Sequence, residues 1–241
     1  MAGEKYHLVV NARESLWALM LEFASAVPTG SWILVGGLMT QVHALRAGVA
    51  ASRQTTDIDA LLNLQVASIS EVAGPIQRLG FVPRVPGLGG QFHRFARGDD
   101  IIDVMVGREI RTPVRWAGRQ VFQAAGAAQA VVRVDEYVLS IGDQEASILV
   151  PDSVGAVIAK SAAHLGDRID RARHLEDLIA LLASTPRDAF LRVELSKKDI
   201  RYLRHLVAEL EDVTQVSWLA LKDTDNNRAR SVLDTIRMRC G

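Results

Sequence analysis

Apolar side chains switch between helical and strand-like spacing along the first 150 residues of the chain. Over residues 14–26 they recur three, four and seven positions apart, which predicts a helix. The apolar run at 32–35 predicts a short buried strand, which Gly36-Gly37 ends. A second helix is expected over residues 38–45, so this region has the order strand, glycine turn, helix.

The pattern after this helix predicts mainly strands. Residues 108–130 are weakly patterned, and no element is assigned to them. The expected elements are a strand at 57–64, a helix at 69–79, a hairpin of strands 91–96 and 101–106 joined by the turn 97–100, and strands at 131–134 and 146–150.

From Pro151 onward, apolar residues recur at helical spacing without a convincing strand. Pro151-Asp152-Ser153 supplies a helix start, and helices are expected at 154–165, 170–183, 197–210 and 227–237. We therefore expect a boundary near residue 150, with one domain at 1–150 and a helical domain at 151–241. Charge does not mark this boundary, because basic and acidic side chains are nearly balanced on both sides of it.

Composition limits the class of protein. The chain has 241 residues, of which 49% are hydrophobic and 23% charged, and its formal net charge is +0. This composition fits a globular protein whose overall charge does not attract nucleic acid or a lipid surface. Any polyanion must therefore be bound by a local cluster of basic residues. The most apolar early stretch, 17–39, is interrupted by Glu22, Pro28 and Gly30, so neither a signal peptide nor a membrane span is expected. Cys240 is the single cysteine, which excludes an internal disulfide and fits a cytoplasmic location.

Candidate chemistry lies in the segment 35–64. Asp57 and Asp59 are two residues apart in a predicted strand, so their carboxylates point to the same side and repel each other. Hard oxygen ligands at this spacing suit one or two Mg²⁺ ions, which would neutralise them and hold a polyphosphate. Asp103, an isolated acid in an apolar strand, is the best candidate for a third ligand. The alternative is a pair of solvent-facing acids at a strand end, because Asp-x-Asp alone is a weak motif.

Residues around the acid pair fit the same chemistry. Gly36-Gly37 permits close approach of the backbone, and the amides at the start of the following helix can bind a phosphate. Arg53 and Thr55 place a guanidinium and a hydroxyl just ahead of Asp57, where a metal-bound triphosphate would lie. The diglycine alone would favour a plain tight turn, so the inference depends on the combination.

This combination resembles a known superfamily. A diglycine, a helix, the run Arg53-x-Thr55-x-Asp57-Ile58-Asp59 and a third Asp on a later strand are similar to the DNA polymerase β type nucleotidyltransferases, most closely the AbiEii toxin branch that includes the MenT toxins. CCA-adding enzymes and aminoglycoside or lincosamide nucleotidyltransferases share this core. The resemblance covers about residues 32–106 and extends into the second part of the chain.

A later segment is similar to the second signature of that branch. Lys160 matches its helical lysine, Arg168 its arginine, Arg173 the start of its closing run and Asp177 the last acid of that run. His174 stands where the branch usually has the first acid, which is a departure from the pattern.

The resemblance implies an α+β (α/β) fold: a nucleotidyltransferase-fold N-terminal domain with a small mixed sheet flanked by helices, and an all-helical C-terminal domain. It implies transfer of a nucleoside monophosphate from an NTP to a hydroxyl, with Mg²⁺ or Mn²⁺ as cofactor. The acceptor would be the tRNA 3′ end and the partner a cognate antitoxin, with no membrane partner. The catalytic residues would be Asp57, Asp59, Asp103 and Lys160, and the three acids would hold the metal. The nucleotide would be bound by Gly36, Gly37, Arg53, Thr55, Lys160, Arg168 and Asp177.

A basic stripe is also expected if one helix is continuous through this second segment. Lys160, His164, Arg168 and Arg171 would then fall within a sector of roughly 80°, from which they would contact the β- and γ-phosphates. Gly166-Asp167 can break such a helix, and a solvated helix face is the alternative.

Two other functions stay open. An antibiotic-modifying nucleotidyltransferase would need an acidic acceptor pocket, whereas a basic patch leading away from the metals would favour tRNA. A catalytically inactive nucleotide-binding module of the same fold is supported by the His174 departure. Trp116 stands among Arg111, Arg115 and Arg119, which makes that segment a candidate contact for nucleic acid.

Overall fold

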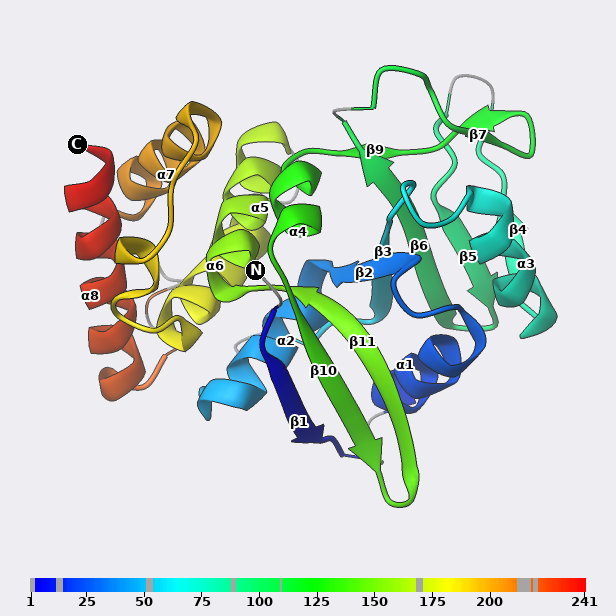
Figure 1. Ribbon diagram of the computed structural model, residues 1–241, viewed down its shortest axis with the longest axis horizontal. Coiled ribbons are helices and arrows are strands. Elements are labelled where there is room, and N and C mark those ends of the chain that lie inside the picture. Colours follow the sequence, from blue (N-terminus) through cyan, green and yellow to red (C-terminus); the bar gives the residue numbers. More distant parts are fainter. Residues whose placement is uncertain are drawn as a thin grey trace.

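The computed structural model describes residues 3–11, 15–50, 54–87, 90–108, 110–167, 171–211, 218 and 221–241. Its main sheet is mixed and has the strand order β2-β3-β6-β5-β4 (Figure 1). β3 and β6 are parallel, the other neighbours along this path are antiparallel, and the short β9 pairs with the end of β6. These strands are β2 (Trp32–Val35), β3 (Asp57–Leu62), β4 (Val82–Arg84), β5 (Arg94–Arg97), β6 (Asp100–Gly107) and β9 (Gln123–Ala124).

The described residues also form two smaller sheets. β1 (Lys5–Val9) runs parallel to β10 (Val134–Ile141), which pairs antiparallel with β11 (Gln144–Pro151). β7 (Arg115–Trp116) and β8 (Arg119–Gln120) form a small hairpin. β10 and β11 extend away from the main sheet as a long hairpin (Figure 1).

Helices cover both faces of the main sheet, and they are the only regular secondary structure in the described residues after Pro151. They are α1 (Ser15–Ala26), α2 (Gly36–Ala47), α3 (Ile69–Arg78), α4 (Ala127–Val132), α5 (Ser153–Gly166), α6 (Arg171–Ser184), the short 3-10 helix η1 (Ala189–Leu191), α7 (Lys197–Leu210) and α8 (Asp223–Cys240). The expected α+β class, with a small mixed sheet flanked by helices and a helical C-terminal part, is confirmed.

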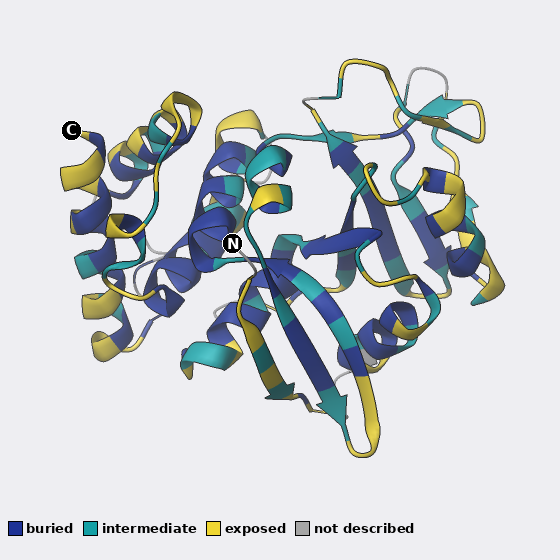
Figure 2. Cartoon of the chain, viewed as in Figure 1, coloured by how far each residue is buried: buried dark blue, intermediate teal, exposed yellow. Residues whose placement is uncertain are grey.

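Alternation along the strands decides which residues enter the core. On β3, Ile58, Ala60 and Leu62 are buried on one face of the sheet, and Ile102 and Val104 continue that face on β6. Figure 2 shows the dark buried positions along these strands and on the sides of the helices that pack against them. The opposite face carries the acids, so the same period of two that builds the core also exposes the candidate site.

Local chemistry explains where several helices begin. Asp152 is the N-cap of α5, and its Oδ1 accepts a hydrogen bond from the Gly155 amide at 2.6 Å, as the Pro-Asp-Ser start signal predicts. Ser68 and Glu71 form a capping box at the start of α3. The helices expected at 14–26, 69–79 and 197–210 are confirmed to within one residue at each end.

The expected strand at 131–134 is wrong. α4 continues to Val132, and β10 begins at Val134. Gly126 precedes α4 with φ of +77°, and a Cβ there would lie 2.8 Å from the Cβ of Ala162 on α5. The close packing of α4 on α5 therefore overrides the β-branched preference of Val131 and Val132. The weakly patterned stretch before it holds β7, β8, β9 and most of α4, and β1 and β4 were not predicted.

The predicted boundary near residue 150 falls between β11 and α5, and α6 packs on α2 across it. The division into two domains stays a prediction. None of the described helices is both long and apolar enough to cross a bilayer.

Candidate active site

Three carboxylates meet on the outer face of the main sheet. Asp59 on β3 lies directly opposite Asp103 on β6 in the parallel register, and Asp57 is two residues earlier on the same face. Each side chain offers an oxygen that lies within 4.8 Å of the oxygens of the other two. The structure thus brings together the three acids that the sequence singled out, in the kind of all-oxygen donor set that divalent cations bind.

Gly36 makes room for one of these acids. It has a φ of +72°, and a Cβ at this position would lie 1.8 Å from Oδ2 of Asp59. Both the backbone conformation and the close approach therefore require glycine. Because α2 begins at Gly36, the amides of its first turn start beside the Asp59 carboxylate. Gly37 is buried within α2.

The field at this cluster is strongly negative. Burial and the neighbouring Asp57 and Asp103 together raise the pKa of Asp59 to about 7, and burial is the largest cause, while Lys160 opposes them. The raised pKa means that the surroundings of Asp59 do not stabilise its negative charge. A bound cation would supply the missing positive charge.

Two neighbours hold the other acids in place. Arg94 on β5 donates to both oxygens of Asp103, from Nε at 2.8 Å and from Nη2 at 2.7 Å. Thr55 donates its hydroxyl to Oδ1 of Asp57 at 2.8 Å. This hydrogen bond orients an acid of the cluster, and the predicted nucleotide contact of Thr55 stays a prediction.

Lys160 and Asp177 form a buried ion pair. Lys160 on α5 donates from Nζ to Oδ2 of Asp177 on α6 at 2.6 Å, and the two side chains are only 7% and 4% exposed. An ammonium has three N–H donors, so this pair fixes Lys160 at the cleft with donors still to spare. Asp177 thereby holds Lys160 in place, and its predicted contact with the nucleotide stays a prediction.

The expected basic stripe is wrong as a continuous surface. Of its described members, Lys160 and His164 lie on α5, which ends at Gly166, whereas Arg171 is the first residue of α6. His164 is 1% exposed, and burial lowers its pKa to about 4, which keeps it neutral. It contacts His205 and Arg171 at 3.0 and 3.4 Å. Of the remaining predicted site residues, Arg53 and Arg168 lie outside the described residues.

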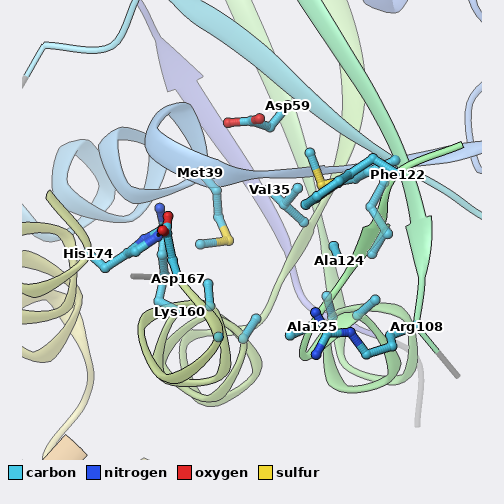
Figure 3. A pocket seen from close by; sticks show the side chains of 18 residues that line it. Val35, Met39, Asp59, Arg108, Phe122, Ala124, Ala125, Lys160, Asp167 and His174 are labelled. Atoms are coloured by element: carbon cyan, nitrogen blue, oxygen red, sulfur yellow. Dashed lines mark hydrogen bonds and ion pairs between the residues drawn. The ribbon is translucent and has the colours of Figure 1, made fainter. Parts of the chain in front are cut away.

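A cleft of about 470 Å³ adjoins the acids (Figure 3). Asp59 and Gly36 line it together with Lys160, and Met39, Leu61 and Met105 make much of its wall apolar. Figure 3 shows Lys160, Asp167 and His174 gathered on one side of the cleft and Arg108 on the other. An acidic end, a cation and a long apolar wall fit a ligand that has both a polyphosphate and a ring.

His174 is part of the cleft lining. Its Nε2 lies 3.2 Å from Oδ2 of Asp167, and burial lowers the pKa of this histidine. His174 is therefore placed at the cleft and paired with an acid.

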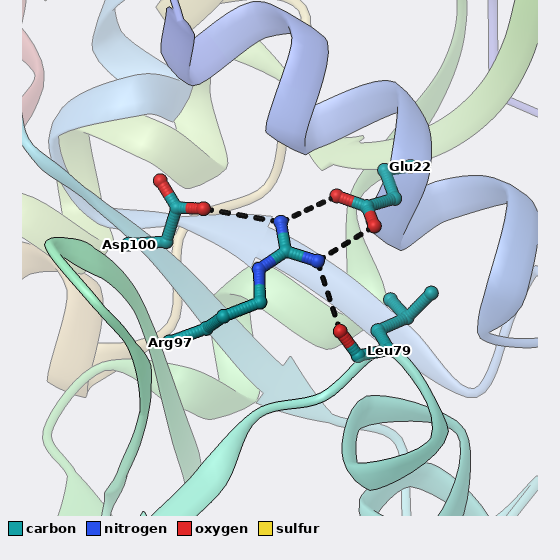
Figure 4. Close-up of polar contacts among 4 residues, drawn as sticks. All are labelled: Glu22, Leu79, Arg97 and Asp100. Carbon is teal, nitrogen blue, oxygen red and sulfur yellow. Dashed lines mark hydrogen bonds and ion pairs between the residues drawn. The ribbon is translucent and has the colours of Figure 1, made fainter.

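The β5–β6 hairpin, which carries both Arg94 and Asp103, is anchored at its turn. Arg97 donates to both oxygens of Glu22 on α1, to the Leu79 carbonyl and to Asp100 (Figure 4). The hydrogen bond to Glu22 raises the pKa of the guanidinium above its ordinary value. This contact ties the hairpin to α1 and α3, and so supports the register on which the site depends.

Arg94 is the main site residue that the sequence analysis missed. The predicted hairpin already contained the signal, because a turn at 97–100 pairs residue 94 with residue 103, as observed. Asp167, Arg108 and Phe122 were also not predicted in the cleft, and their placement depends on contacts distant in the sequence.

Neither a family model nor a curated protein matches this sequence. Among solved structures, the chain is similar to the crystal structure of an antigenic nucleotidyltransferase-like protein from Paracoccidioides brasiliensis. The identity is 14% and the TM-score 0.47, over 83% of this chain and 88% of that chain. A likeness at this level carries over neither a residue role nor an activity, so function must be argued from the site itself.

Proposed function

We propose that this chain is a metal-dependent nucleotidyltransferase that moves a nucleoside monophosphate from an NTP to an acceptor hydroxyl. The observation that carries the proposal is the shared position of Asp57, Asp59 and Asp103, within 4.8 Å of one another at a cleft that also contains Lys160. Acids gathered beside a helix N-terminus and a cation suit chemistry at a polyphosphate.

The residues present fit a pair of divalent cations. Three carboxylates supply hard oxygen ligands, and the raised pKa of Asp59 indicates missing positive charge. Bound there, Mg²⁺ or Mn²⁺ would neutralise the acids and polarise the α-phosphate oxygens.

The chain's own groups have distinct roles in this proposal. The acceptor oxygen forms a bond to the α-phosphorus while the bond from that phosphorus to the bridging oxygen breaks, and pyrophosphate leaves. Asp103 takes the proton of the acceptor hydroxyl, with its orientation fixed by Arg94. Lys160 and the first amides of α2 bind the charge that develops on pyrophosphate.

The finer part of the proposal concerns the acceptor. A tRNA 3′ end as acceptor, a cognate antitoxin as partner and a cytoplasmic toxin role are supported by the sequence resemblance alone. They extend the chemistry above and do not follow from it.

The test is a transfer assay. We expect purified protein with Mg²⁺ and an NTP labelled on its α-phosphate to transfer label to total tRNA and to release pyrophosphate. Transfer should stop when the divalent cation is chelated, and Asp57→Asn should abolish it. Asp99→Asn is the matched control, because Asp99 is an exposed acid in the turn of the same hairpin, outside the cluster, and it should retain full transfer.

Three other results would redirect the proposal. Label in an aminoglycoside but not in tRNA would indicate the antibiotic-modifying alternative. Nucleotide binding without transfer to any acceptor would indicate an inactive module. A wild-type protein that binds no nucleotide in the presence of Mg²⁺ would contradict the proposal as a whole.

A further inference from the structure

The chain is locally basic where it leaves the candidate site. Between Asp103 and Asp135 it contains five arginines and a single acid, Glu109, although the whole chain has a formal net charge of +0. We call four of these arginines, Arg108, Arg111, Arg115 and Arg119, the arginine rim. A local excess of positive charge of this size can bind an anion, even though the composition of the whole chain is balanced.

The arginine rim has no acid to neutralise it within the described part of the chain. Arg108, Arg111 and Arg115 are exposed, and no ion pair is formed by any member of the rim with a described residue. The weak contact of Arg115 is to a carbonyl, that of Gly118, at 3.5 Å. By contrast, Arg94 and other arginines elsewhere bind carboxylates at 2.7 to 3.0 Å. Unpaired guanidinium groups are available to an external anion.

The rim begins at the cleft and continues away from it. Arg108 and Phe122 line the cleft at the carboxyl end of β6, where the Val106 amide donates to the Phe122 carbonyl at 2.9 Å. From there the chain forms the β7–β8 hairpin, which carries Arg115 and Arg119 (Figure 1). The rim thus starts with Arg108 at the cleft lining and continues along the chain to the β7–β8 hairpin.

Trp116 anchors this hairpin instead of presenting its ring to a ligand. Its ring centroid lies 4.9 Å from that of Phe92 and 5.3 Å from that of Phe95. The segment around Trp116 stays a candidate contact for nucleic acid, but the ring of Trp116 itself packs on the protein. Phe122 lines the cleft, as Arg108 does, and is 41% exposed, with its ring centroid 6.0 Å from that of His93.

We infer that the arginine rim binds the sugar-phosphate backbone of a single-stranded nucleic-acid acceptor and that Phe122 stacks on a base of that strand near the cleft. This inference rests on the proposed function. Unpaired arginines followed by an exposed ring match the two parts of single-strand recognition, namely phosphate neutralisation and base stacking. A cationic acceptor would be repelled by the same surface, which argues against an aminoglycoside.

The test compares binding by two variants with equal loss of charge. The rim variant is Arg111→Gln/Arg115→Gln/Arg119→Gln, which leaves the cleft lining intact. The control variant is Arg78→Gln/Lys197→Gln/Arg201→Gln, at exposed basic residues on α3 and α7. The probe is a fluorescent single-stranded oligoribonucleotide of about 12 nucleotides, followed by anisotropy over a range of salt concentrations.

The expected loss follows from counterion release. Each phosphate contact with a single strand contributes about 0.7 to the slope of log K against log salt, so three contacts contribute about 2. At about 0.15 M salt, the rim variant should then bind the probe about 50-fold more weakly than wild type and with a slope lower by about 2. The control variant should match wild type, and Phe122→Ala should weaken binding without a change in slope.

Nucleotide binding in the presence of Mg²⁺, measured by calorimetry, separates this inference from the proposed function. Wild type and rim variant should bind NTP equally. A rim variant that binds the probe like wild type, or a control variant that loses as much, would overturn the inference. So would polyglutamate that competes as well as an oligoribonucleotide of equal charge, because the surface would then fit an acidic protein. Failure of wild type to bind NTP would instead overturn the proposed function.

Discussion

Replacing Asp59 by asparagine is expected to stabilise the metal-free protein while it abolishes metal binding. Burial and the neighbouring acids raise the pKa of Asp59 from 3.8 to about 7. A difference of about three pKa units, at about 1.4 kcal/mol each, corresponds to about 4 kcal/mol of cost when this carboxyl is ionised in the folded state. Because the side chain keeps some contact with solvent at the cleft, we expect about half of this, ~2 kcal/mol.

The dependence on pH has a definite sign. Below the ordinary pKa of 3.8, Asp59 is protonated in both the folded and the unfolded chain, so it contributes nothing. Between 3.8 and about 7 the unfolded chain loses this proton while the folded chain keeps it, so the wild type loses stability as the pH rises. Above about 7 the loss is complete. The advantage of Asp59→Asn should therefore be absent in acid and largest in mild base.

Urea denaturation in a chelator, at about pH 4 and about pH 8, measures this difference as a free energy of unfolding. Mg²⁺ should stabilise the wild type and leave the asparagine variant unchanged, since only the wild type has the complete set of ligands. Asp99→Asn, in the hairpin turn, is the control and should show neither effect. A variant that is less stable than wild type without metal, or an equal gain from Mg²⁺ in both proteins, would refute the electrostatic reasoning.

Three further predictions follow from buried or clamped groups. Lys160→Met should remove the buried ion-pair partner of Asp177 and cost about 3 kcal/mol, and adding Asp177→Leu should restore stability but not transfer; urea denaturation and the transfer assay separate the two effects. Burial lowers the pKa of His43 to about 3, so the free energy of unfolding of the wild type should fall by about 1.4 kcal/mol per pH unit below 6.5. His43→Gln should lack this part of the acid sensitivity, and equal acid sensitivity of both proteins would contradict the prediction. Arg97→Met should release Glu22 and lower the free energy of unfolding by about 1 to 2 kcal/mol, with a smaller effect from Arg78→Met.

Much of the main sheet could be predicted from local patterns. The apolar run at 32–35 and the alternation after Asp57 are strong signals, because one face of each strand is buried against helices. The same alternation places Asp57 and Asp59 on one face. That Asp103 lies beside them depends on the parallel pairing of β3 with β6, which the sequence could suggest only through the isolated acid in an apolar strand.

Other parts depend on contacts that no local pattern encodes. β1 pairs with β10 across more than 120 residues, and its own sequence, KYHLV, is too short and too exposed to identify it. α4 is helical because Gly126 allows it to pack closely on α5. The basic stripe was inferred from helical periodicity, and it failed because the helix breaks after Gly166. Arg94 could have been predicted as a site residue, since the predicted hairpin register already paired it with Asp103.

The central claim is that Asp57, Asp59 and Asp103 together hold divalent cations beside the cleft, where the nucleotide would bind. Anomalous diffraction from crystals grown with Mn²⁺ and a nonhydrolysable NTP analogue tests it most directly. The account predicts Mn²⁺ peaks in contact with all three carboxylates and with the triphosphate, and none in Asp59→Asn crystals. Nucleotide bound in the cleft with Mn²⁺ elsewhere, or with no Mn²⁺ at these acids, would contradict the account.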